Sequence, residues 1–401
     1  MKKTTKLVGF VAAAALLAAT PAFADDLKLG VLLGFTGPLE AMSPPMEASV
    51  KLALSEINAD GGVNGQQVGE VSADDGCSNT DLAVASADKL INTDKVSAII
   101  GGLCSGVTIA AANSVAIPAG VLMLSPSATS PAVTTMVDKD LVFRTATSDA
   151  YNGQVLAKIL WTKGLKDIGI TYVNTDYGKG LAQSIADAFT ADGGKVTANI
   201  AHEEGKADYR AELGQLAAAG SKNLVVVAYA QGSGHTILQQ AIESGDFTTY
   251  AGGDGVVDNS LFAGIDPKAL EGMTAMKPGS PASPGIAAFE ALAKAANLDP
   301  TSTYVPQSYD AAFLLAAALE KTGGKKEGLS QALRDVATAP GEVVLPGEWK
   351  KAAELIKAGK DIDYQGASGP VEFDPAGDVA GVVIEMTAKD GKWVEVGPAN
   401  P

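Results

Sequence analysis

The chain has 401 residues, of which 46% are apolar, and its 46 acidic and 30 basic side chains give a net charge of −16 at pH 7. Such an acidic protein lacks the basic surface that nucleic acids and anionic membranes require, so we expect neither as a partner. With His202 and His235 as its two histidines, the chain has little material for a zinc site or a Ser-His-Asp triad, and we expect no metal, no cofactor and no catalytic residues.

The first 24 residues have the pattern of a secretory signal. A start with three lysines is followed by the apolar run Leu7–Ala19 and by the cleavage site Ala22-Phe23-Ala24. The run is too short to span a bilayer, and no cysteine follows the cleavage site to carry a lipid anchor. We predict a signal peptide over residues 1–24, export to the periplasm, and a mature chain of net charge −19 without membrane insertion.

Residues 27–124 alternate strand patterns with helix patterns. We predict strands over Leu27–Leu33, in a run ending at Asp74, over Val96–Ile100 and Val121–Leu124, and helices over Met46–Asn58, Asp81–Asn92 and Val107–Ala116. Short strands separated by helices of about 10–15 residues are typical of a parallel sheet with helices on both faces. This part of the chain therefore predicts one doubly wound α/β unit.

The pattern restarts at residue 149 and predicts a second unit of the same kind. We expect helices over Asp149–Lys163, Gly180–Ala191, Tyr209–Ala219 and Thr236–Ser244, and strands over Ile168–Val173, Val196–Ile200 and Leu224–Ala228. A length of 401 residues is also more than one hydrophobic core usually serves. The fold class is therefore α/β with two Rossmann-like doubly wound lobes.

The elements predicted in the last third of the chain add to the two units. The Pro/Gly/Ser-rich stretch Lys277–Gly285 reads as a crossing segment. Helices follow over Ile286–Ala296, Ser308–Lys321, Leu329–Ala337 and within Gly347–Gly359, and strands over Pro370–Phe373, Val382–Met386 and Trp393–Val396. Strands this close to the end predict that the chain comes back to complete one or both sheets.

Polar loops follow several of the predicted strands, where open parallel sheets bind their ligands. Ser105 follows the third strand, and its hydroxyl could hold a carboxylate or could simply cap the next helix. The loop Ser125–Pro131 contains Ser127, Ala128 and Thr129, and its two prolines stiffen it. Two such sheets place the ligand in the cleft between lobes.

The second unit offers similar loops. Tyr177 and Tyr229 follow strands, where a ring can cover a ligand and a hydroxyl can donate. Asp254 lies in a glycine-rich turn and could meet a cation, although Asp-Gly is also a common turn dipeptide. No G-x-S-x-G motif is present and no carboxylate pair is singled out by spacing, so we expect a binding protein rather than an enzyme.

Taken in order, these loops resemble the leucine/isoleucine/valine-binding protein family, periplasmic receptors that serve ABC importers of hydrophobic amino acids. The motifs are Gly34–Pro38, Glu56–Gly65, Asp74–Cys77, Leu103–Ser105, Leu124–Thr129, Asp176–Ala182 and Gly253–Gly255. The resemblance covers about Leu27 to Val396, and so many motifs in one order are specific to this family.

The resemblance implies two lobes joined by three crossovers, near Arg144–Thr147, Met276–Pro278 and Asp374–Asp378. Residues 25–146 and 278–374 would form the N-terminal lobe, and residues 147–277 and 375–401 the C-terminal lobe. It also implies a disulfide between Cys77 and Cys104, which export favours over two buried free thiols. The segment Gly341–Gly369 is longer than in the shorter family members.

The resemblance further implies a ligand-binding set, which comprises Ser105, Ser127, Ala128, Thr129, Tyr177, Tyr229, Asp254 and Met42. The ligand carboxylate would meet Ser105 and the Thr129 N–H, and the ammonium would meet the Ser127 carbonyl, the Thr129 hydroxyl and Asp254. The two tyrosines would close over the ligand. The family often has Glu at the position of Asp254 and an aromatic residue at that of Met42.

The function implied is a monomeric receptor that captures a branched-chain amino acid between closing lobes and delivers it to the permease subunits of an ABC importer. Related receptors bind other solutes, so a small amide, urea or an aromatic carboxylate is the alternative ligand. A ligand-sensing regulatory subunit would use the same lobes. A periplasmic amidohydrolase is disfavoured because the sequence lacks a catalytic constellation.

Overall fold

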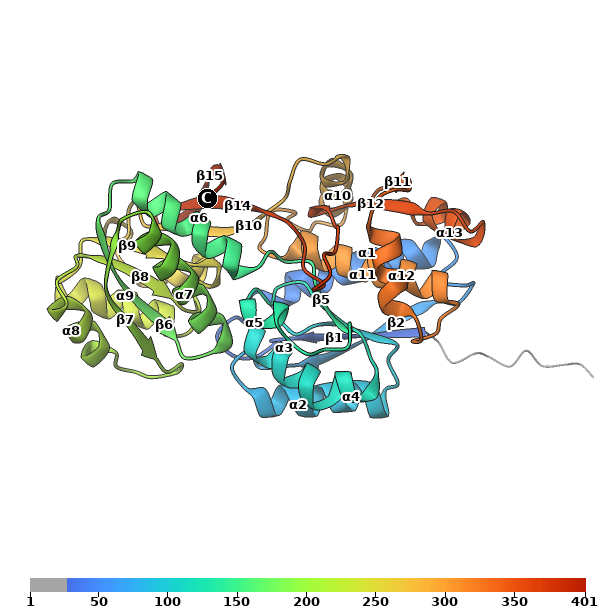
Figure 1. Ribbon diagram of the computed structural model, residues 1–401, viewed down its shortest axis with the longest axis horizontal. Helices are drawn as coiled ribbons and strands as arrows, with labels where there is room; N and C mark the ends of the chain where they lie inside the picture. The colour runs from blue at the N-terminus through green and yellow to red at the C-terminus, as the bar shows by residue number, and fades with distance from the viewer. Residues whose placement is uncertain (1–26) are drawn as a thin grey trace, which may run out of the picture.

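The computed structural model describes residues 27–401, and the predicted signal peptide lies outside these described residues. Figure 1 shows two α/β lobes side by side, joined by several chain segments. Each lobe is built around its own sheet, as predicted, with 5 strands in the first and 7 in the second. Among the described residues, no helix has the length and apolar character needed to cross a membrane.

The first sheet has the order β2-β1-β3-β4-β5, and all of its strands are parallel. The strands are β1 Leu27–Leu33, β2 Val68–Asp74, β3 Ala98–Gly101, β4 Met123–Ser125 and β5 Val142–Arg144. The intervening helices are α1 Ser43–Ala59, α2 Thr80–Asp88 with its π-helical continuation η1 Lys89–Thr93, α3 Ser105–Ala111 with η2 Ala112–Ala116, α4 Ile117–Ala119 and α5 Pro131–Thr134.

Helices cover both faces of this sheet. In β1, Val31 packs into the core beneath α1 and the later helix α11, Val305–Thr322, whereas its neighbour Leu32 packs with the opposite core beneath α2 and α3. Figure 1 shows these two helix layers above and below the sheet. Because successive strand residues face opposite sides, burial of both faces explains why β1 is an almost continuous apolar run.

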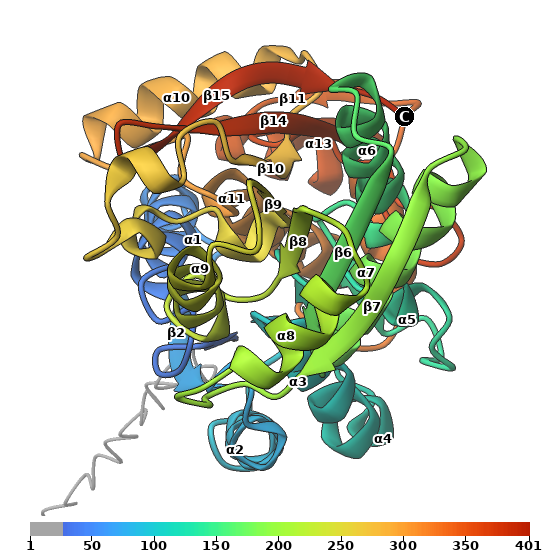
Figure 2. The same cartoon turned by 90° about the vertical axis from the view of Figure 1, so that its left-hand side faces the viewer.

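The second sheet has the order β15-β14-β10-β9-β8-β6-β7 (Figure 2). Its strands are β6 Asp167–Val173, β7 Lys195–His202, β8 Asn223–Val227, β9 Thr249–Gly252, β10 Thr274–Gly279, β14 Val382–Lys389 and β15 Lys392–Ala399. Its helices are α6 Asp149–Thr162, α7 Asp176–Ala191, α8 Arg210–Ala218 and α9 Ser233–Ser244, with the 3-10 turns η3 Asp254–Val256, η4 Asn259–Phe262 and η5 Pro267–Ala269. Strands β14 and β15 form an antiparallel hairpin at its edge.

Residues 284–370 pack on the first lobe. They form α10 Pro284–Ala295, α11 Val305–Thr322, α12 Leu329–Ala337, α13 Trp349–Lys357 and a small sheet of β11 Glu342–Val344, β12 Ile362–Gly366 and β13 Gly369–Pro370. The segment Gly341–Gly369 is anchored by the buried Trp349, whose indole N–H donates to the Gly62 carbonyl at 3.1 Å. The Asp310 carboxylate accepts the N–H groups of Ala367 and Ser368, both at 2.7 Å.

One expectation about this region is wrong. The strand expected over Pro370–Phe373 is limited to Gly369–Pro370, because only these residues pair with β12. The segment Met276–Pro278, near which a crossing is expected, belongs to β10, which continues to Gly279 because it pairs with the returning β14, for example Pro278 with Val383. That partner arrives about a hundred residues later in the chain, so the local sequence gives no sign of it.

The crossings are tied together by Arg144 at the end of β5. This guanidinium is fully buried and makes a bidentate ion pair with Asp378, with Nε–Oδ1 and Nη2–Oδ2 distances of 2.7 and 2.6 Å. Its Nη1 donates to the Ser130 carbonyl at 2.9 Å. One side chain therefore connects the first crossing, the third crossing and the loop after β4.

Candidate functional site

Loops from both lobes meet at a small cavity beyond the carboxyl ends of the strands. Its lining residues are Leu39, Met42, Leu103, Cys104, Ser105, Ser127, Thr129, Tyr177, Tyr229, Asp254, Gly255 and Tyr304. Seven of the eight predicted ligand residues are therefore brought together here. The enclosed space is about 20 Å³, roughly what one water molecule needs, so an amino acid requires the lining side chains to move.

Ser105 is the first residue of α3, and Cys104 rather than Ser105 occupies the N-cap position. The Ser105 hydroxyl oxygen instead accepts the Ser130 N–H at 3.1 Å, and it donates to no residue within 27–401. Its proton is therefore available to an acceptor in the cavity. A buried hydroxyl in this state suits a carboxylate better than a cation.

The Thr129 hydroxyl can only accept a hydrogen bond from the cavity, whereas the Ser105 hydroxyl can donate one. Its hydroxyl donates to Asp149 Oδ2 at 2.8 Å, so the oxygen has only lone pairs left to offer to the cavity. An ammonium can donate to that oxygen, but a carboxylate cannot. The Thr129 N–H makes no hydrogen bond within residues 27–401 and remains free to donate. One residue thus offers an acceptor and a donor to the two ends of an α-amino acid.

The loop that carries Ser127 and Thr129 is held rigidly by its own side chains. The Ser125 hydroxyl accepts the Ala128 N–H at 2.9 Å and donates to the Gly102 carbonyl at 2.7 Å, and the Ser127 hydroxyl donates to the Leu103 carbonyl at 2.7 Å. Ala128, which was also predicted to bind the ligand, does not line the cavity; its N–H donates to Ser125 and its carbonyl accepts from Arg144 Nη1 at 3.3 Å.

The loop that carries Ser105 is fixed by a disulfide and a buried carboxylate. Cys77 and Cys104 are bonded, which confirms the predicted disulfide. The Asp75 carboxylate accepts the N–H groups of Cys77 and Leu103 at 2.8 and 2.7 Å. Burial raises the Asp75 pKa to about 6, although both hydrogen bonds oppose that shift.

The second lobe contributes the Asp254 carboxylate. Tyr177 donates its hydroxyl to Oδ1 at 2.9 Å, and the Tyr304 hydroxyl donates to Oδ2. The Tyr177 ring stacks on Tyr229 with centroids 5.5 Å apart. Burial raises the Asp254 pKa, and the two tyrosine hydrogen bonds oppose that shift. The carboxylate is thus surrounded by aromatic rings and lacks a cationic partner within residues 27–401.

Sequence reasoning missed Tyr304, which lines the cavity, and Asp149, which contacts Thr129 behind it. Asp149 begins α6, is fully buried, and accepts hydrogen bonds from Thr129 and Asn152. Burial, and then the charge of Asp254, raise the pKa of Asp149 to about 8. Each of these two buried carboxyl groups therefore disfavours the charged form of the other.

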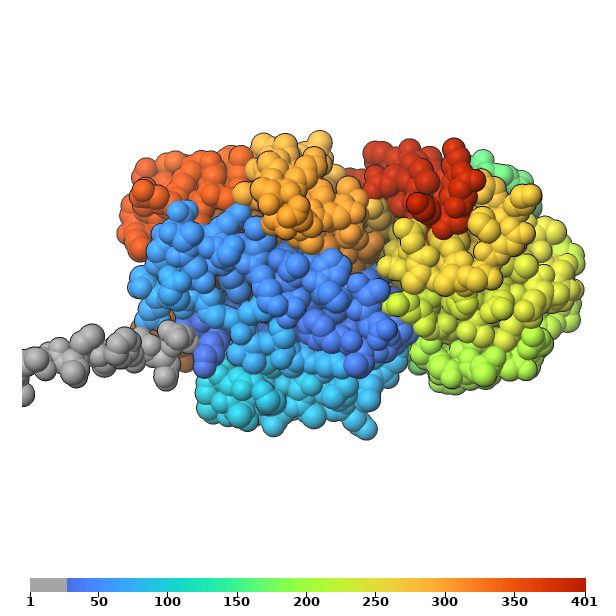
Figure 3. All heavy atoms as spheres, turned by 180° about the vertical axis from the view of Figure 1, so that it is seen from behind, coloured from blue at the N-terminus to red at the C-terminus, as the bar shows by residue number. Residues whose placement is uncertain are grey.

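The lobes touch around this cavity. The Ser130 hydroxyl donates to the Asp176 carbonyl at 2.9 Å, and the Ala41 N–H donates to Gln231 Oε1 at 3.0 Å. The Gln231 N–H in turn donates to the Pro38 carbonyl at 3.3 Å. Figure 3 shows the blue first lobe against the yellow second lobe on the rear face. Within the described part of the chain, no group of His, Cys, Asp and Glu side chains could hold a metal ion.

Comparisons with known proteins agree with this architecture. A family model described as periplasmic binding protein matches residues 26–381. The leucine-, isoleucine-, valine-, threonine- and alanine-binding protein of Pseudomonas aeruginosa is 32% identical, over 83% of this chain and 90% of the relative. The leucine-specific-binding protein of Salmonella typhimurium is 31% identical, over 95% of this chain and 94% of the relative.

Solved structures give the same result. The branched-chain amino acid transporter substrate-binding protein LivJ from Streptococcus pneumoniae, in complex with isoleucine, has a TM-score of 0.77 and 25% identity, covering 94% of this chain and all of that one. A solute-binding protein from R. palustris in complex with benzoate has a TM-score of 0.75 over 94% of this chain and 97% of its own. At 20% identity it shows the shared fold alone.

Proposed function

Because the chain belongs to the periplasmic binding protein family, we propose that it is a periplasmic receptor for a branched-chain amino acid that serves an ABC importer. The relatives named for leucine, isoleucine and valine support this class of ligand. The observation that carries the proposal is the separation of free donors on the first lobe from the buried Asp254 carboxylate on the second.

The ligand's two charged ends have distinct partners. Its carboxylate accepts the Ser105 hydroxyl and the Thr129 N–H, both of which lack other acceptors among residues 27–401. Its ammonium donates to the Thr129 hydroxyl, the Ser127 carbonyl and Asp254. Charge pairs inside a closed cavity are stronger than in water because solvent is excluded. The aliphatic side chain is left to the apolar Leu39 and Met42.

Closure of the lobes completes this site. We assign residues 25–146 and 278–374 to one moving lobe and residues 147–277 and 375–401 to the other. Asp254, Tyr177 and Tyr229 belong to the second lobe, so an amino acid gains these contacts only in the closed state and thereby selects it. The Ala41–Gln231 and Ser130–Asp176 hydrogen bonds support closure as a defined state.

The Asp254 carboxylate also argues against the alternative ligands. Urea and amides are neutral and an aromatic carboxylate is negative, so none of them offers a cation to pair with Asp254. The surroundings of His202 give no support for a catalytic role. That ring contacts the Ser233 hydroxyl at 3.0 Å, but the Ser233 proton goes to Glu204, and the group lies outside the cavity.

Calorimetric titration of the mature protein with leucine, isoleucine and valine tests the proposal, with acetamide, urea and benzoate as matched competitors. We expect a 1:1 complex with an aliphatic amino acid and a higher Tm in its presence, because a ligand that binds only the native state stabilises it. NMR of the bound ligand should show no product. Preferential binding of urea or benzoate, or turnover of the amino acid, would overturn the assignment.

A further inference from the structure

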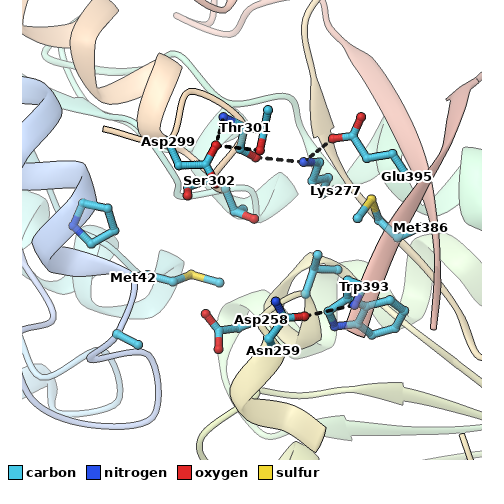
Figure 4. A pocket seen from close by; sticks show the side chains of 14 residues that line it. Met42, Asp258, Asn259, Lys277, Asp299, Thr301, Ser302, Met386, Trp393 and Glu395 are labelled. Carbon is cyan, nitrogen blue, oxygen red and sulfur yellow. Dashed lines mark hydrogen bonds and ion pairs between the residues drawn. The ribbon is translucent and has the colours of Figure 1, made fainter. Parts of the chain in front are cut away.

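A second and larger cavity lies beside the ligand cavity, between the lobes and next to the crossing strands (Figure 4). Its volume is about 350 Å³, against about 20 Å³ for the ligand cavity. The start of α1, the segment after η3, strands β10, β14 and β15, and the loop before α11 form its walls. It is large enough for the tail of an amino acid side chain, and the proposed function does not use it.

Met42 is the single residue that lines both cavities. It is only 5% exposed and lies at the N-cap position of α1, where its side chain makes no capping hydrogen bond. Figure 4 shows its thioether projecting toward the second cavity. An unbranched thioether has three rotatable bonds and adapts its shape readily. A flexible apolar side chain therefore lies where the two spaces meet.

The second cavity is acidic. Asp258, Asp299 and Glu395 line it, and Lys277 is the one basic residue among its lining residues. Lys277 is already engaged, since its Nζ pairs with Glu395 at 2.6 Å and donates to the Thr301 carbonyl at 2.9 Å. Asp258 accepts the Ser260 N–H at 2.7 Å but makes no ion pair within residues 27–401. A cation that entered this space would find an uncompensated carboxylate.

We propose that Met42 sets the maximum length of the ligand side chain, and that the cavity behind it is a latent subsite for a long unbranched tail that ends in an ammonium group. This inference rests on the proposed function. In the wild-type protein the Met42 side chain terminates the pocket, so short aliphatic side chains fit and longer ones meet the thioether. Truncation of Met42 joins the two spaces, and Asp258 then supplies the partner for the cationic end.

Calorimetric titration with leucine, norleucine and lysine tests this, using the wild type, Met42→Ala and the control Met386→Ala. Met386 lines the second cavity but not the ligand cavity, so the same truncation there enlarges the second cavity without joining the spaces. We expect Met42→Ala to lower the Kd of lysine relative to that of leucine at least tenfold. Met386→Ala should leave this ratio within threefold of the wild-type value.

A second variant separates length from charge. Adding Asp258→Asn to Met42→Ala should cancel the gain for lysine and preserve any gain for norleucine. An equal change of the lysine-to-leucine ratio in Met42→Ala and Met386→Ala would overturn the proposal, as would a lysine gain that survives Asp258→Asn. If the wild type binds no amino acid at all, the proposed function fails. If it binds leucine and a folded Met42→Ala gains nothing for lysine, only the present inference fails.

Discussion

Replacing Asp254 with asparagine removes one negative charge from the site while keeping the shape of the side chain. Asp254 is 4% exposed, and both of its oxygens are held by tyrosine hydroxyls, so an ammonium beside it has little water to replace the lost partner. Breaking a buried ion pair by removing one partner costs about 3–5 kcal/mol. At about 1.4 kcal/mol per factor of ten, leucine affinity should fall by roughly 100-fold or more.

The same change should not destabilise the ligand-free protein, because burial already disfavours the charged form of Asp254. Calorimetry of Asp254→Asn with leucine measures the affinity, and thermal unfolding without ligand measures the stability. Asp187→Asn, which makes the same charge change on the exposed face of α7, is the matched control and should bind like the wild type. A folded Asp254→Asn variant that binds leucine within threefold of wild type would refute the assigned ammonium partner.

Further predictions concern stability, pH and closure. Cys77→Ser should lower the Tm in oxidising buffer, because a disulfide that closes a loop of this size stabilises the folded state by about 3–4 kcal/mol. As the control, the variant and the wild type should have equal Tm values in reducing buffer. The Asp149 pKa of about 8 means that the folded state binds more protons than the unfolded state between about pH 4 and 8. Ligand-free stability should therefore fall as the pH rises through this range, and Asp149→Asn should flatten the profile of Tm against pH. Gln231→Ala removes the side-chain acceptor for the Ala41 N–H and should weaken leucine binding several-fold; small-angle scattering of the ligand-free variant should show a more open shape than wild type.

The sequence predicted most of the fold because the strands are apolar runs bounded by turn residues. Leu27–Leu33 is a strand with the predicted bounds. Val142–Arg144 and Thr249–Gly252 were missed, because segments of three and four residues are too short to show a period. The antiparallel edge formed by β14 and β15 depends on pairing with β10, a contact that no local pattern encodes.

The candidate site was also only partly predictable from the sequence. Ser105, Thr129 and Asp254 follow strands, where the topology of open sheets predicts ligands. Tyr304 reaches Asp254 from a left-handed residue just before α11, fifty positions away, so only the packed fold reveals the contact. Asp149 looks like an ordinary acidic residue in the first turn of a helix, and its hydrogen bond to Thr129 became visible only in three dimensions.

Arg144 connects the proposed ligand loop to a chain segment that crosses between the lobes. Its guanidinium grips Asp378 in one crossing segment and the carbonyls of Ala128 and Ser130 in the ligand loop. A change in the shape of this loop would therefore disturb the Arg144–Asp378 ion pair. In such a receptor the binding groups of the first lobe would keep their arrangement while the lobes open and close. Only the second lobe would then have to move onto the bound molecule.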